Sequence, residues 1–199
     1  MRIISGELGG RLLKTVSGPG YRPATDKVRQ ALFSMLEARG VEWSHCRVLD
    51  LFAGSGSLGF EALSRGAASA CFVEKMRQAA AVIGQNAESL GLDSTRVSII
   101  AKDVRTVLKK RTDRPFDLAF IDPPYRKGLV KPVMRMLLQS GWLQDDGLVA
   151  AEVEVEIRPD DVATSELVEL VDKTYGQTRI CIWQQRSRPR QSTRGPSTP

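Results

Sequence analysis

The sequence is poor in the residues that build disulfide frameworks and metal centres. It contains three cysteines and one histidine among 199 residues. The cysteines, Cys46, Cys71 and Cys181, are odd in number and far apart, so they match neither a disulfide framework nor a paired-cysteine metal motif. We therefore expect reduced thiols that pack as small apolar residues, no metal, and a cytoplasmic location. His45 has no partner motif, and we expect no catalytic role for it.

Long apolar runs are also absent. No stretch approaches the roughly 18 apolar residues that a helix needs to span a bilayer. The opening residues 1–6 lack the apolar region of a secretory signal. Hydrophobic residues nevertheless make up 42% of the chain, and domains of about 150 residues already bury most of their unfolded surface. The sequence therefore predicts one soluble α/β domain with an appendage, and no membrane partner.

Positive charge is concentrated at the two ends of the chain, whose net charge is +6. Residues 1–39 carry seven Lys or Arg against three Asp or Glu, and residues 186–199 carry four Arg and no acid. Residues 40–185 carry 18 basic and 20 acidic residues. Basic ends of this kind favour a polyanionic partner such as RNA or DNA, and they equally fit a solvated surface with a soluble tail. The tail has no apolar residue to bury, so we expect it to be disordered.

The middle of the chain alternates apolar strand patterns with helical patterns. Strands separated by helices of this length predict βαβ units and a parallel sheet covered on both faces. The last two strands, separated by a short turn at Gly176, should form an antiparallel hairpin at one edge. The predicted strands are 48–52, 70–74, 97–101, 116–121, 148–153, 167–175 and 179–185, and the predicted helices are 58–64, 76–90, 104–110 and 129–139.

An N-terminal region precedes this alternation. Residues 2–16 alternate apolar and polar side chains around three glycines, which predicts a small β-hairpin. After a linker rich in glycine and proline, Thr25 or Asp26 can cap a helix that ends before Gly40. We therefore divide the chain into an N-terminal extension, residues 1–39, a principal domain, residues 40–185, and a basic tail, residues 186–199.

A glycine-rich turn follows the first predicted strand of the principal domain. Gly54, Gly56 and Gly59 have the spacing GxGxxG, and Glu74 stands at the end of the next strand. Glycines let the backbone turn tightly and approach a ligand, and an acid beyond the second strand accepts hydrogen bonds from ribose hydroxyls. This pattern alone fits a dinucleotide enzyme as well as a methyltransferase.

Two further acids favour S-adenosylmethionine over a dinucleotide. Asp50 ends the strand before the loop, where it would repel a pyrophosphate and attract an ammonium or sulfonium group. Asp103 follows the third strand and can accept a hydrogen bond from an adenine amino group. The predicted cofactor site consists of Asp50, Phe52, Ala53, Gly54, Gly56, Glu74 and Asp103.

The motif Asp-Pro-Pro-Tyr, residues 122–125, follows the fourth predicted strand at the sheet edge where α/β proteins bind ligands. An exocyclic amine on a base is a poor nucleophile because its lone pair is delocalised into the ring. When the nitrogen attacks a methyl group it becomes positive, so acceptors aimed at its N–H groups lower the barrier. Asp122 and the carbonyl of Pro123 are the predicted acceptors, and Tyr125 offers a face on which an extruded base stacks.

With these residues in view, the chain resembles the RsmD family, bacterial methyltransferases of a guanine N2 amine in 16S ribosomal RNA. The similarity runs from residue 1 to about residue 185. It rests on the segments 1–6, 10–12, 22–33, 50–66 and 122–128. The chain departs from the family pattern at Ala24 and Gln30, where Thr and Glu are usual, and at Lys27, which is often Arg.

The resemblance implies a Rossmann-like seven-strand sheet with helices on both faces, plus the N-terminal β-hairpin. It implies that the principal domain is a methyltransferase domain that binds S-adenosylmethionine as methyl donor, and that ribosomal RNA or the small ribosomal subunit is the partner. It also implies that the extension contacts RNA, and we expect a monomer. The RNA-contact residues expected from the match are Arg2, Arg11, Arg22 and Arg29.

Other interpretations stay open. Methyltransferases of adenine N6 in DNA or RNA, or of a protein glutamine amide, present a similar amine to a similar motif. The chain has no separate domain for DNA recognition, and a glutamine methylase more usually has Asn at the first motif position. A Rossmann oxidoreductase fits the glycine spacing. A non-catalytic RNA-binding module would keep the basic ends without needing Asp50 or Asp122.

Overall fold

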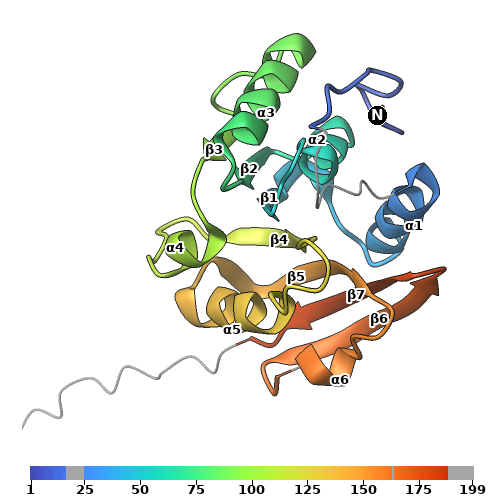
Figure 1. Ribbon diagram of the computed structural model, residues 1–199, viewed down its shortest axis with the longest axis vertical. Coiled ribbons are helices and arrows are strands. Elements are labelled where there is room, and N and C mark those ends of the chain that lie inside the picture. Colours follow the sequence, from blue (N-terminus) through green and yellow to red (C-terminus); the bar gives the residue numbers. More distant parts are fainter. Residues whose placement is uncertain (17–24, 163, 188–199) are drawn as a thin grey trace, which may run out of the picture.

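The computed structural model describes residues 1–16, 25–162 and 164–187. Its seven-stranded sheet has the order β3-β2-β1-β4-β5-β7-β6 (Figure 1). Strands β1 to β5 run parallel, and β7 pairs antiparallel with both β5 and β6. The predicted parallel sheet with an antiparallel hairpin at one edge is confirmed. The strands are β1 Arg47–Leu51, β2 Ser69–Val73, β3 Val97–Ile100, β4 Phe116–Ile121, β5 Leu143–Glu154, β6 Leu167–Tyr175 and β7 Thr178–Gln185.

Helices cover both faces of the sheet, in two groups that Figure 1 shows apart from each other. On one face, α1 Asp26–Glu37, α2 Ser57–Ser64 and α3 Arg77–Leu90 share an apolar core with the strands. On the other, α4 Val104–Leu108, α5 Val130–Ser140 and α6 Pro159–Val162 do so. This two-sided cover explains why β1 and β4 are apolar along most of their length.

The strand order places a topological switch between β1 and β4. From β1 the chain continues outward through β2 and β3, and it then returns to β4 on the other side of β1. The carboxyl ends of these strands are level, because Leu51 pairs with both Val73 and Ile121. In open α/β sheets, ligands bind in the crevice at such a switch point.

The N-terminal segment, residues 1–16, folds back on itself but forms no strand. One isolated antiparallel bridge joins Arg2 and Leu12. The predicted hairpin is thus reduced to a single bridge, because other backbone groups of the segment bond to α2 instead. For example, the Ile4 amide donates to the carboxylate of Glu61 at 2.7 Å.

Helix α1 begins where the sequence predicted. The side chain of Thr25 accepts a hydrogen bond from the amide of Val28 at 3.3 Å, which caps the helix. The N-terminal segment shares the core of α1 to α3 through Ile3 and Leu13. The division of the chain at residue 39 stays a prediction.

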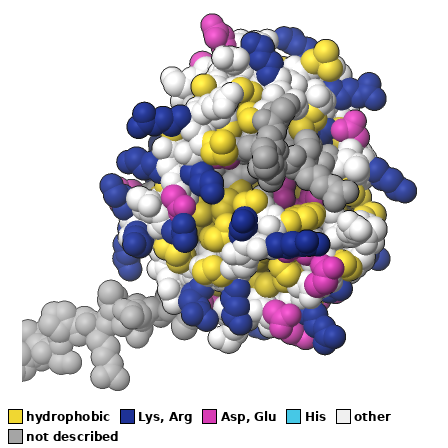
Figure 2. Space-filling view, viewed as in Figure 1, with side chains coloured by type: hydrophobic (Ala, Val, Ile, Leu, Met, Phe, Trp, Pro, Cys, Tyr) yellow, Lys and Arg dark blue, Asp and Glu magenta, His cyan; other side chains and the backbone are white. Residues whose placement is uncertain are grey.

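Residues 17–24, 163 and 188–199 lie outside the described residues, and with them Arg22 and most of the predicted basic tail. None of the helices in the described ranges combines the length and apolar character that crossing a membrane requires. On the face seen in Figure 2, Lys and Arg side chains stand around the margin and hydrophobic side chains gather in the middle.

Candidate active site

Acidic side chains end four neighbouring strands of the sheet. Asp50 and Glu152 lie near the carboxyl ends of β1 and β5, and Glu74 and Asp122 directly follow β2 and β4. Because β2, β1, β4 and β5 are adjacent and parallel, these residues, which we call the acid row, reach one edge of the sheet. Asp50, Glu74 and Glu152 are buried and Asp122 is half-buried.

The carboxyl groups of the acid row repel one another when they ionise. None of the ion pairs within the described residues includes one of its four carboxylates. Burial raises the pKa of Asp50 to about 7. The hydrogen bond from the Gly59 amide opposes this rise, and repulsion from Glu74 adds to it. Burial also raises the pKa of Asp122 well above its ordinary value, and repulsion from Glu152 and Asp50 adds to the rise. A cationic group bound beside Asp50 would relieve part of that repulsion, so this end of the row fits the sulfonium and ammonium of S-adenosylmethionine.

Glu74 organises the glycine loop. One of its carboxylate oxygens accepts a hydrogen bond from the amide of Gly54 at 2.9 Å, and the other accepts one from Met76 at 2.8 Å. Gly54 and Gly56 both have positive φ angles. A Cβ atom on Gly56 would lie 2.6 Å from the Phe60 ring. Glycine at position 56 is therefore required by the backbone conformation of the loop and by its packing against the core.

Asp50 fixes the start of α2. Its Oδ2 accepts a hydrogen bond from the amide of Gly59 at 3.0 Å, inside the protein. A Cβ atom on Gly59 would come within 2.3 Å of the Phe72 ring, so glycine is needed for α2 to lie close to β2. The predicted attraction between Asp50 and the cofactor stays a prediction.

Phe52 and Ala53 form the turn between β1 and the glycine loop. Phe52 has a φ of 70°, which is rare for a bulky residue. The amides of Phe52 and Ala53 both donate to the carbonyl of Val73 at 3.1 Å, and these bonds hold the turn. Strained backbone of this kind clusters at ligand sites, where surrounding bonds maintain it.

Asp103 reaches the same edge of the sheet, after β3, but its carboxylate is already engaged. It caps α4 and forms an ion pair with Arg105 at 2.9 Å. The hydrogen bond from the Arg105 side chain lowers the pKa of Asp103. An adenine amino group would have to share this carboxylate with Arg105, so the cofactor role of Asp103 stays a prediction.

The loop that carries the Asp-Pro-Pro-Tyr motif is tied to the neighbouring strands. The hydroxyl of Tyr125 lies 2.9 Å from Oγ1 of Thr178 in β7. The amide of Arg126 donates to the carboxylate of Glu154 in β5. Pro123 is buried in this loop. These contacts attach the loop to β5 and β7, and the catalytic role of the motif stays a prediction.

Sequence reasoning missed Glu152. It stands inside a predicted apolar strand, residues 148–153, and a charged residue within a strand buried on both faces was the available signal. Burial raises the pKa of Glu152 to about 7, although the hydroxyls of Tyr125 and Thr178 donate hydrogen bonds to its carboxylate and oppose the rise.

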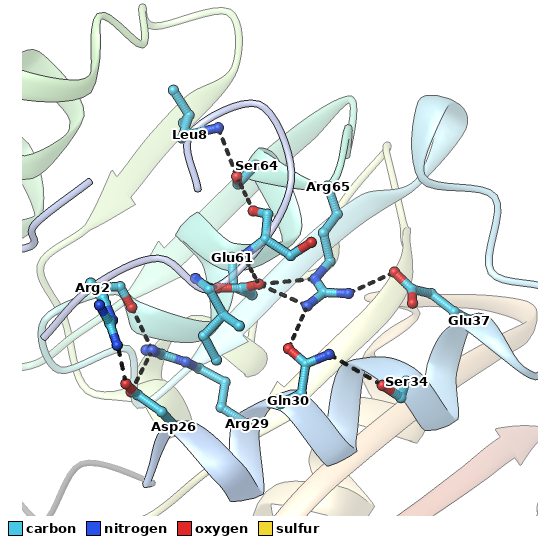
Figure 3. Close-up of polar contacts among 12 residues, drawn as sticks. Arg2, Leu8, Asp26, Arg29, Gln30, Ser34, Glu37, Glu61, Ser64 and Arg65 are labelled. Carbon is cyan, nitrogen blue, oxygen red and sulfur yellow. Dashed lines mark hydrogen bonds and ion pairs between the residues drawn. The ribbon is translucent and has the colours of Figure 1, made fainter. Parts of the chain in front are cut away.

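Arg29 is not presented to RNA. Its side chain is only 1% exposed, and its guanidinium donates to the carbonyl of Arg2 at 2.5 Å and to Asp26 at 3.0 Å (Figure 3). The prediction that Arg29 contacts RNA is therefore wrong. Arg29 instead attaches the N-terminal segment to α1, and its charge is balanced within the protein, as a buried charge requires.

Glu61, also missed, holds the same segment to α2. It is fully buried and accepts hydrogen bonds from the amides of Ile4 at 2.7 Å and Ser5 at 3.1 Å. Glu61 also forms an ion pair with Arg65 at 2.9 Å. Arg65 forms a second ion pair, with Glu37 of α1, at 2.7 Å. Figure 3 shows this chain of charges between the N-terminal segment and α1.

The N-terminal segment also reaches the glycine loop. The amide of Val16 donates to Oγ of Ser55 at 2.9 Å. Asn86 of α3 accepts from the amide of Lys14 at 2.8 Å and donates to the carbonyl of Ser55 at 3.1 Å. Because Ser55 lies between Gly54 and Gly56, the segment that bears the predicted RNA contacts is hydrogen-bonded to the predicted cofactor loop.

Arg2 and Arg11 are exposed, as an RNA contact requires. Arg2 lies 3.9 Å from Asp26 in an ion pair open to solvent, and Arg11 donates to the carbonyl of Ser89 at 2.7 Å. Neither side chain is buried by these contacts, so for both residues the RNA contact stays a prediction.

Comparison with known proteins agrees with this geometry. Residues 1–184 match the protein family described as conserved hypothetical protein 95. Ribosomal RNA small subunit methyltransferase D of Escherichia coli K12 is 40% identical over 156 residues, 78% of this chain and 76% of that protein. YlbH of Bacillus subtilis is 36% identical over 189 residues, 94% of this chain and 100% of YlbH. The solved structure of Escherichia coli yhhF has a TM-score of 0.81 at 33% identity and covers 94% of this chain and 99% of its own. The chain therefore belongs to this family, the RsmD family of methyltransferases.

Proposed function

We propose that this protein transfers a methyl group from S-adenosylmethionine to the N2 amine of a guanine in the RNA of the small ribosomal subunit. The proposal rests on one observation above all. The Asp-Pro-Pro-Tyr motif and the glycine loop lie on adjacent strands, β4 and β1, at the switch point of the sheet. The name of the Escherichia coli relative, a small-subunit ribosomal RNA methyltransferase, supports the substrate.

The donor side of the site consists of the glycine loop and the acids around it. S-adenosylmethionine supplies an activated methyl group when it is bound. Glu74 keeps acceptor capacity toward ribose hydroxyls, because a carboxylate has about four lone-pair sites and, within the described ranges, two backbone amides donate to it. Asp50 contributes negative charge toward the cationic ligand.

The acceptor side is the loop after β4. Asp122 accepts from an N–H of the reacting amine, and the carbonyl of Pro123 accepts from the other, since the flanking prolines restrict the backbone. Both acceptors act on charge that develops on nitrogen only during transfer. Tyr125 offers its ring to the target base, for which stacking contributes about 1–3 kcal/mol.

We assign the RNA side to exposed basic side chains. Arg2 and Arg11 are exposed on the N-terminal segment, and Lys and Arg side chains surround a more apolar centre in Figure 2. Neutralising phosphates with such side chains provides most of the salt-dependent affinity for nucleic acid. We propose that the protein acts on the ribosomal RNA or the assembled subunit as a cytoplasmic monomer.

The decisive experiment is methyl transfer from labelled S-adenosylmethionine to small subunits that lack their native guanine-N2 methylation. Nucleoside mass spectrometry then identifies the product. We expect N2-methylguanosine from the parent protein and none from Asp122→Ala, with cofactor binding nearly unchanged in the variant. Asp113→Ala, at an exposed aspartate, is the matched control. Label in adenine or in a protein glutamine would refute the guanine assignment while retaining the methyltransferase.

A further inference from the structure

Glu152 lies next to the Asp-Pro-Pro-Tyr loop. In the parallel pairing of β4 with β5, Ile121 lies opposite Ala151, so the next residues of the two strands are Asp122 and Glu152. The negative charge of Glu152 raises the pKa of Asp122, and the hydroxyl of Tyr125 donates a hydrogen bond to Glu152. Glu152 therefore contacts Tyr125 and lies beside Asp122, the two side chains that we assign to the acceptor site.

The surroundings of Glu152 are unfavourable for a charge. Its side chain is 6% exposed, and no ion pair within the described residues includes it. Two hydroxyls, of Tyr125 and Thr178, are the donors that face its carboxylate. A buried carboxylate without a cation costs stability. Buried acids whose pKa is strongly perturbed, and which lie beside a candidate site, are candidates for a functional role.

The charged groups around Glu152 strengthen this reading. Asp122 after β4 is the titratable neighbour of Glu152, and Asp50 in β1 acts in turn on Asp122; all of these groups carry negative charge when ionised. On β7, Arg179 is engaged by Asp172 of β6 at 3.2 Å. On β5 itself, the carboxylate of Glu154 accepts a hydrogen bond from the Arg126 amide. Glu152 and Asp122 thus form an acidic pair with no cation assigned to it among the described residues.

We propose that Glu152 is a positioning residue of the methyl-transfer site, which orients Tyr125 through its hydroxyl and shares negative charge with Asp122. The inference rests on the function proposed above. Glu152 and Thr178 both contact the Tyr125 hydroxyl, and these two partners hold the far end of the ring on which the base stacks.

The shared charge makes the Asp122–Glu152 pair the acceptor of the proton that the methylated nitrogen gives up. The N–H bond breaks with its electrons left on nitrogen, an O–H bond forms on Asp122, and the negative charge of the pair falls by one. Because two close carboxylates resist ionising together, the pair binds this proton more strongly than a lone exposed carboxylate does.

The test compares Glu152→Gln and Glu152→Ala with the parent, using whichever amine the parent methylates, across a range of pH. The amide of Glu152→Gln keeps an oxygen for the Tyr125 and Thr178 hydroxyls but removes the charge. We expect its kcat to persist to lower pH than that of the parent, with the acidic limb displaced by about one unit, because Asp122 then ionises more readily. Glu152→Ala also loses the bond to Tyr125, and we expect kcat to fall about tenfold or more.

A second measurement needs no acceptor. Thermal unfolding of Glu152→Gln and the parent, followed from about pH 5 to about pH 8, reports the charge of the pair directly. We expect the variant to gain stability over the parent as pH rises, since the parent must ionise a buried group. Glu169→Gln, the same change at an exposed position of β6, should follow the parent in both measurements.

Unchanged pH profiles in both measurements would overturn the role of Glu152, even with the parent fully active. A different outcome is that Asp122→Ala forms no product while both Glu152 variants behave like the parent. That result would support the proposed function and refute the role of Glu152. Absence of any methyl transfer by the parent would instead refute the proposed function, and the unfolding profiles would still decide whether the acidic pair exists.

Discussion

The carboxylate of Glu74 accepts a hydrogen bond from the amide of Gly54 at 2.9 Å. This bond joins the end of β2 to the glycine loop after β1, so one acidic side chain both shapes the loop and lies where a ribose is expected. The proposed cofactor site and its supporting structure are therefore parts of the same hydrogen-bond arrangement.

Replacing Glu74 by Ala should weaken binding of S-adenosylmethionine. The change removes an acceptor for the ribose and releases the Gly54 amide, and a lost hydrogen bond to a charged group costs about 1.5 kcal/mol or more. Isothermal titration calorimetry measures the effect. Glu88→Ala, at an exposed position of α3, is the control, and equal affinities for the two variants would remove Glu74 from the site.

Replacing Gly59 by Ala should destabilise the protein by about 1–3 kcal/mol, because the new Cβ atom would overlap the ring of Phe72 at 2.3 Å. Gly84→Ala is the matched control, since it also changes a helical glycine. There the Cβ atom meets only Ile99, at 3.8 Å, and we expect a gain of about 1 kcal/mol from helix propensity. Denaturant unfolding of both variants tests the contrast, and a stable Gly59→Ala protein would contradict the close packing.

Asp50 should make stability depend on pH. Its pKa is raised by burial to about 7 in the folded protein, from an ordinary value near 3.8. The folded state therefore binds its proton more tightly than the unfolded chain does. This contribution is complete below about pH 3.8 and is lost as pH rises through about 7.

The substitution Asp50→Asn tests this dependence. The variant should be more stable than the parent at about pH 8, while its affinity for S-adenosylmethionine falls because the attracting charge is gone. Thermal unfolding and calorimetry provide the two measurements. If stability of parent and variant followed the same pH profile, Asp50 would not carry the raised pKa.

Replacing Glu61 by Ala should release the N-terminal segment. Glu61 is fully buried, and its removal leaves Arg65 and the amides of Ile4 and Ser5 without their acceptor. Breaking a buried ion pair in this way costs about 3–5 kcal/mol. Hydrogen exchange at residues 4 and 5 should accelerate together with the loss in unfolding stability. Slow exchange at these amides in the variant would show that other contacts hold the segment.

The order of elements was predictable because it depends on local patterns. The apolar strands and the helices between them carry periodicities that any compact fold must respect, and all seven strands lie where the patterns indicated. β5 is an exception at one end. It begins at Leu143 rather than at residue 148, because the polar stretch before Leu148 forms an irregularity opposite Phe116 and Leu118 that looks like a turn in the sequence.

Arg29 and Glu152 illustrate what the sequence could not decide. Arg29 lies in a basic segment that favours RNA contact, but its side chain points into the protein because the carbonyl of Arg2 and the carboxylate of Asp26 come together there. Glu152 looks like an isolated acid in an apolar strand. Only the pairing of β4 with β5 brings it beside Asp122 and Tyr125.

The sequence by itself determined the parallel sheet, the glycine loop, the Asp-Pro-Pro-Tyr motif and the family, since each of these is written in contiguous residues. The tertiary structure alone decided which charges meet. Contacts such as Glu61 with Ile4, or Glu152 with Tyr125, join residues from separate elements, and their burial and pKa depend on the surroundings that the fold assembles. The local sequence pattern specifies the helices and strands. The electrostatics of each charged side chain depends on where the packing of those elements places it.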